Sequence, residues 1–132
     1  MTFDRKYLTW ALAYAIAGMS LGIFMAVSHN HAQHPTHAHI NLVGFVASFV
    51  YAVVHRLWLG EGAPRLAKAQ FIVHQTGALV MFAGLFMLFG NFVPEAQLEP
   101  MLAFSSIAVL LGAVLMLFMV FRANTAGHRA PA

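Results

Sequence analysis

The fold is decided by residues 7–55, YLTWALAYAIAGMSLGIFMAVSHNHAQHPTHAHINLVGFVASFVYAVVH, which contain no Asp, Glu, Lys or Arg. A helix that spans a bilayer takes about 20 apolar residues, so this run is long enough for two spans. Outward from it, residues 69–94 and 100–121 are also free of charge, and each is long enough for one more span. We therefore predict an all-α membrane protein, a bundle of four antiparallel transmembrane helices at about 7–28, 36–58, 69–92 and 100–122.

The composition agrees with a membrane location. Of the 132 residues, 61 % are hydrophobic and 8 % are charged, whereas an average soluble domain has about 25 % charged residues. A soluble enzyme is therefore excluded, and the seven Lys and Arg residues form no basic stripe for nucleic acid. The chain has no cysteine, which excludes disulfides, iron–sulfur clusters and covalently attached c-type haem. Its eight histidines are the residues left to carry chemistry.

The basic residues predict the orientation. All seven flank the predicted helices on one side: Arg5, Lys6, Arg56, Arg65, Lys68, Arg122 and Arg129. The positive-inside rule makes that side cytoplasmic, and both termini with it. The chain then consists of a transmembrane domain, residues 1–122, and a polar C-terminal tail, residues 123–132.

The second predicted helix carries a polar face. Its members follow one another at steps of 4, 3, 4, 3 and 4 residues: His37, Asn41, Gly44, Ser48, Tyr51 and His55. Lipid offers these groups no partner, so the face must contact protein or a cofactor. His39 lies two residues after His37, which at about 100° per residue places it about 200° round the helix. The two imidazoles therefore point to nearly opposite sides and suit two different sites.

His55 and His74 lie at comparable distances from the cytoplasmic ends of their helices, so we expect them at a similar depth. Neutral imidazole is a good ligand for haem iron, copper and zinc, and the spans hold no Asp, Glu or Cys for calcium, magnesium or iron–sulfur sites. Small residues such as Gly18 and Gly22 leave room beside the helices. We therefore predict non-covalent haem b, with axial ligands drawn from His37, His39, His55 and His74.

The segment HAHINLVGF, residues 37–45, resembles the His-x-His helix in the catalytic subunit of haem–copper oxidases, in the form found in nitric oxide reductases. The segment HQTG, residues 74–77, resembles the H-x-x-G that often follows one helix later in small relatives. The resemblance implies that His37 holds a high-spin haem and His39 a low-spin haem. It also implies a multi-pass protein of the bacterial inner (cytoplasmic) membrane.

The chain differs from that family in its size and in the number of histidines that could bind a metal. The family's catalytic subunits contain three arcs of four helices, whereas this chain is predicted to have four helices and lacks the full set of additional histidines that hold copper. One chain cannot form a complete haem–copper centre, so an enzymatic activity stays open. The resemblance implies one arc that works as a homo-oligomer, for instance a trimer, in electron transfer, gas sensing or haem handling.

Two other interpretations use the histidines differently. In the first, copper or zinc binds the outer loop through His29, His31 and His34, without a porphyrin. In the second, the histidines only bridge helices in a structural subunit, although such polar contacts average about 0.6 kcal/mol in membranes. The substitution His39→Ala separates these interpretations. We expect it to remove the cofactor if the protein binds haem, to change little if the outer loop binds a metal ion, and to destabilise the protein modestly if the histidines only bridge helices.

Overall fold

The structure is a computed structural model that describes residues 1–127, and every regular element in that part of the chain is a helix. In chain order the elements are α1 (Phe3–Ser28), α2 (His34–His39), η1 (Ile40–Val46), α3 (Ala47–Val54), η2 (His55–Leu59), α4 (Pro64–Phe89) and α5 (Glu95–Gly127). The elements from α2 to η2 form one continuous helix, His34–Leu59, which we call the composite helix. It and α1, α4 and α5 are each long and apolar enough to cross a membrane, which confirms the prediction of four such helices.

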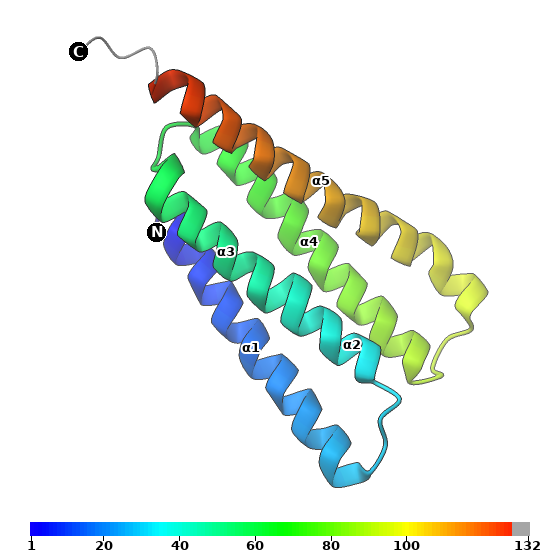
Figure 1. The fold of residues 1–132 in the computed structure, drawn as a ribbon. Helices are drawn as coiled ribbons and strands as arrows, with labels where there is room; N and C mark the ends of the chain where they lie inside the picture. The colour runs from blue at the N-terminus through cyan, green and yellow to red at the C-terminus, as the bar shows by residue number, and fades with distance from the viewer. Residues whose placement is uncertain (128–132) are drawn as a thin grey trace.

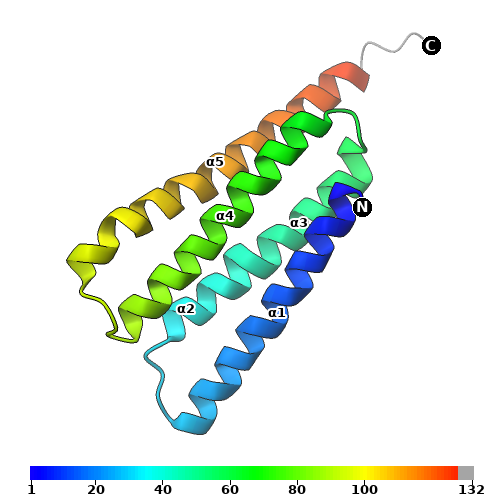
Figure 2. The same cartoon turned by 180° about the vertical axis from the view of Figure 1, so that it is seen from behind.

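The helices run alternately up and down (Figure 1). The N-terminus, the link from the composite helix to α4 and the end of α5 lie at one end of the molecule, the inner end. The α1–α2 and α4–α5 links lie at the opposite, outer end, as Figure 2 shows from behind. α1 packs along the composite helix and α5 packs along α4, whereas α5 contacts the composite helix chiefly through η2, at the inner end.

All four long helices begin earlier than the sequence analysis places them, the composite helix slightly, at His34, and the other three by about one turn, at Phe3, Pro64 and Glu95. The predicted boundaries followed the charged residues, but charged side chains are good helix formers and do not end a helix outside the apolar run. Pro100, where the predicted last helix begins, lies inside the second turn of α5. There it removes one backbone hydrogen bond near the helix start, which the rest of a 33-residue helix tolerates.

The last helix also continues beyond its predicted end. α5 reaches Gly127, so residues 123–127 are helical although they were assigned to the polar tail. No glycine or proline interrupts residues 122–126, and a polar sequence without such a breaker can extend a helix past the apolar span. The remaining tail residues, 128–132, lie outside the described part of the chain.

Two buried clusters hold the helices together. The inner cluster contains Tyr7, Ala52, Ala67, Met116 and Met119, and the second contains Tyr14, Ala78, Met81 and Phe82. In each cluster a tyrosine of α1 donates its hydroxyl to a glutamine of α4, Tyr7 to Gln70 at 2.5 Å and Tyr14 to Gln75 at 2.7 Å. Buried polar groups in an apolar bundle need such partners, so these bonds fix how α1 meets α4.

Large apolar side chains also cover much of the outside of the molecule. More than half of the side-chain surface is exposed at Leu12, Ile16, Met19 and Ile23 on α1 and at Phe104, Ile107, Leu110, Val114 and Leu117 on α5. Contiguous apolar surface of this extent is unusual on a soluble monomer and is typical of a surface in contact with lipid or another protein.

Candidate cofactor sites

A backbone carbonyl fixes each of the two outer histidines of the predicted pair. Nδ1 of His37 lies 2.8 Å from the oxygen of Gly18 on α1, and Nδ1 of His39 lies 2.8 Å from the oxygen of Pro35, one turn earlier. A carbonyl oxygen can only accept, so Nδ1 donates and carries the proton in both neutral rings. The lone pair is then on Nε2, and metal-ligating histidines are usually held in this way by a partner on the other nitrogen. Both imidazoles are therefore oriented to offer Nε2 to a metal.

The small-residue face of α1 makes room for His37. A Cβ atom built on Gly22 would lie 3.0 Å from Cε1 of His37, and one built on Gly18 would lie 2.6 Å from Nδ2 of Asn41. Asn41 donates that amide to the carbonyl oxygen of His37 at 2.9 Å, and the same amide nitrogen lies 3.4 Å from Nδ1 of His37, whose nearer partner is the carbonyl oxygen of Gly18 at 2.8 Å. A larger residue at either glycine would displace this part of the predicted polar face.

His39 begins an exposed apolar row on the composite helix. Leu42, Val46 and Phe49 follow it at steps of 3, 4 and 3 residues and are 63 %, 44 % and 44 % exposed. The structure therefore leaves the His39 side of the helix largely uncovered by the rest of the described chain. His37, by contrast, faces α1. The two histidine side chains therefore lie in different environments, as their spacing in the sequence predicts.

His55 and His74 are buried at the inner end without hydrogen-bond partners. Their side chains are 3 % and 0 % exposed, and neither nitrogen of either ring has a partner among the described residues. Both approach the ring of Tyr7, with centroid distances of 5.7 Å for His55 and 6.2 Å for His74. Leaving a buried polar group unpaired costs about 1–3 kcal/mol. These two imidazoles are therefore candidates for contact with something other than the protein.

The composite helix turns π-helical beside two of the four histidines. η1 begins at Ile40, directly after His39, and η2 begins at His55 itself. In η2 the amide of Gly60 donates to the carbonyl of His55 at 3.0 Å, five residues back. π segments are rare and occur frequently at functional sites. No sequence pattern predicted them, because the side-chain periodicity of the helix barely changes over so few residues.

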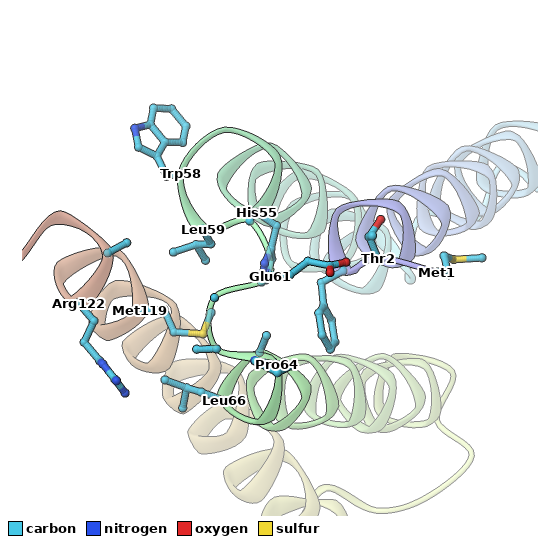
Figure 3. Close-up of a pocket in the computed structure, with 16 residues that line it drawn as sticks. Met1, Thr2, His55, Trp58, Leu59, Glu61, Pro64, Leu66, Met119 and Arg122 are labelled. Atoms are coloured by element: carbon cyan, nitrogen blue, oxygen red, sulfur yellow. The ribbon is translucent and has the colours of Figure 1, made fainter. Parts of the chain in front are cut away.

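A cavity of about 540 Å³ lies at the inner end, between the start of α1, η2, the link to α4 and the end of α5 (Figure 3). Apolar residues make most of its wall, including Phe3, Trp58, Leu59, Leu66 and Met119, and Glu61 and Arg122 add charge. Figure 3 shows the His55 ring directed into it from η2. Sequence reasoning identified His55 but missed the cavity and Met119, since both depend on where α5 packs.

The structure does not gather the three histidines of the outer link. His29, His31 and His34 are exposed, and His29 has the left-handed backbone, with φ of 53°, that ends α1. Among residues 1–127, no three His, Cys, Asp or Glu side chains come together as a group that could hold a metal ion. The copper or zinc interpretation stays a prediction that has no preassembled set of ligands.

No known protein family, curated protein or solved structure matches this chain. The resemblance of residues 37–45 to haem–copper oxidases therefore stays a prediction.

Proposed function

We propose that this chain is an integral membrane protein that binds non-covalent haem b at the outer end, with His37 of one copy and His39 of another as the axial ligands. The four long apolar helices and the exposed apolar side chains of α1 and α5 support a location in a membrane. The basic residues from Arg5 to Arg122 lie near the inner end and support a cytoplasmic location for that end and for both termini. A bacterial inner membrane fits this arrangement.

The observation that carries the proposal is the fixed tautomer of the two outer histidines. Each holds Nδ1 on a backbone carbonyl and keeps Nε2 free of any hydrogen bond with the described residues. A haem supplies four nitrogens of its own and needs only one or two donors from the protein. Within residues 1–127 the donors are imidazoles that no group of three His, Cys, Asp or Glu side chains brings together, which fits that requirement better than it fits a bare metal ion.

The open side of His39 supports a homo-oligomer. Leu42, Val46 and Phe49 form an apolar row beside it, and another copy of the chain can cover this row. In lipid an imidazole at such a surface has no partner, so a haem bound between copies would satisfy Nε2. A trimer is one such assembly. Haem iron supplies a one-electron redox centre that also binds small gases, which suits electron transfer, gas sensing or haem handling.

The experiment that tests the proposal is an absorption spectrum of the protein purified in detergent after haem-sufficient expression. We expect a Soret band, sharp α and β bands after dithionite reduction, and haem b in a pyridine haemochrome assay. His39→Ala and His37→Ala should each lower the haem content severalfold. His31→Ala is the matched control, because His31 is an exposed histidine of the same end of the molecule, and it should keep the wild-type spectrum.

A folded, monodisperse protein without porphyrin would overturn the proposal. Unchanged haem content in both His37→Ala and His39→Ala would overturn the assignment of the ligands. Copper and zinc analysis of the same samples tests the alternative interpretation, in which His29, His31 and His34 of the outer loop bind a metal ion.

A further inference from the structure

The imidazole ring of His55 is covered on its faces by other rings, whereas its two nitrogens have no partner among the described residues. Its ring stacks with Phe3, at a centroid distance of 5.6 Å and an angle of 28°, and with Tyr7, at 5.7 Å and 22°. Rings that lie nearly parallel to the imidazole cover its π surface and leave its edge for other contacts. Neither nitrogen on that edge has a hydrogen-bond partner in the described part of the chain, although the side chain is only 3 % exposed. Metal coordination by imidazole also takes place in the plane of the ring, through this edge.

Met119 reaches the same cavity from the other side. It is 4 % exposed, and Figure 3 shows its thioether directed from α5 into the space that His55 enters from η2. α5 meets the composite helix chiefly at η2, so this is the place where α5 can bring a donor close to His55. Nitrogen from histidine and sulfur from methionine are a known axial pair for haem iron.

The other properties of the cavity favour a porphyrin over a bare ion. Two donors do not complete the coordination of a metal ion, and residues 1–127 contain no group of three His, Cys, Asp or Glu side chains that could hold one. The volume of about 540 Å³ and the mostly apolar wall are typical of a site for a large organic ligand. Arg122 at the wall supplies a cation that can pair with a carboxylate of such a ligand.

We propose that this cavity holds a second haem b, with His55 and Met119 as its two axial ligands. This inference rests on the proposed function only for the identity of the cofactor. His74 does not line the cavity; its ring packs edge-on against Tyr51 at a centroid distance of 4.9 Å and its Cβ lies beside Gly112. His55 therefore takes its second ligand from α5, and His74 is not the partner.

The test compares redox titrations and haem contents of single variants of the full chain. The wild type should show two haem components with different midpoint potentials, because methionine ligation raises the potential of a haem relative to bis-histidine ligation. His55→Ala should lose the component of higher potential and keep the other, whereas His39→Ala should do the reverse. Added imidazole should restore haem to folded His55→Ala protein, which a merely structural role of His55 does not explain.

Met119→Leu tests the second ligand without emptying the cavity. It should keep the inner haem but lower its midpoint potential and convert its ferric spectrum from low-spin to high-spin. The matched control is Met116→Leu, because Met116 is also buried in the inner cluster, at 5 % exposure, but does not line the cavity. It should leave both components unchanged.

The outcomes separate this inference from the proposed function. Haem that depends on His37 and His39 but not on His55 or Met119 overturns the inner site and leaves the outer one standing. Haem that depends on His55 and Met119 alone overturns the outer site. An isoprenoid quinone that copurifies with the wild type and is lost in His55→Ala, at unchanged haem content, overturns a haem in this cavity.

Discussion

Gln75 of α4 joins Tyr14 of α1 to Ser48 of the composite helix. It accepts the hydroxyl of Tyr14 at Oε1, 2.7 Å away, and donates Nε2 to Oγ of Ser48 at 3.2 Å. Because all three residues are buried, one amide satisfies the polar groups of two neighbouring helices. This chain of bonds locks three of the four long helices together near the middle of the molecule.

Gln75→Leu should therefore lower the free energy of unfolding. The substitution leaves two buried hydroxyls without their partner, and interhelical hydrogen bonds in membranes are worth about 0.6 kcal/mol each and at most about 1.7 kcal/mol. Reversible unfolding in mixed micelles, followed by circular dichroism, measures the change. The exposed residue Gln97 provides the control, since Gln97→Leu removes no buried hydrogen bond. Equal stability of both variants would show that the Gln75 bonds do not hold the bundle.

Gly44→Ala should destabilise the protein by overpacking. A Cβ atom at this position would lie 2.8 Å from Cγ of Tyr14 and 3.1 Å from Cζ of Phe82, both in the same buried cluster. Extra methyl groups in a filled interior typically cost about 1–3 kcal/mol. Gly62→Ala adds the same group where the nearest atom is 3.7 Å away, and its thermal midpoint should match the wild type. A Gly44→Ala protein as stable as Gly62→Ala would mean that α1 and the composite helix are less closely packed.

The orientation in the membrane can be measured directly because the chain has no cysteine. Asn30→Cys introduces a thiol at the outer end and Gly62→Cys introduces one at the inner end. A membrane-impermeant maleimide added to intact spheroplasts should label the Asn30→Cys protein and should reach the Gly62→Cys protein only after lysis. The reverse pattern would place the basic inner end outside the cytoplasm and contradict the positive-inside assignment.

The sequence predicts the large features of this fold and few of its contacts. Charge-free runs identify the four helices, because lipid tolerates no unpaired charge over the length of a span. The spacing of polar residues on the composite helix correctly places Gly44, Ser48 and His55 on a buried face. The helix starts were misplaced, since charged residues mark the limit of the apolar run and not the limit of the hydrogen-bonded helix.

The sites were harder to predict than the helices. The carbonyl partner of His39 is four residues away, but that of His37 lies on another helix, and no pattern in one segment reveals it. The stacking of Tyr7 on His55 and the entry of Met119 into the cavity depend on how three helices meet. Residues far apart in sequence create these features, so periodicity along any one helix carries no trace of them.

The stacking at the inner end also limits how His55 can move. Its imidazole cannot rotate about the Cβ–Cγ bond without displacing Tyr7, whose hydroxyl is bonded to Gln70 on α4. Gln70 in turn donates to the carbonyl of Gly112 on α5. A rotation of one small ring is thereby tied, through Tyr7 and Gln70, to the relative positions of all four long helices.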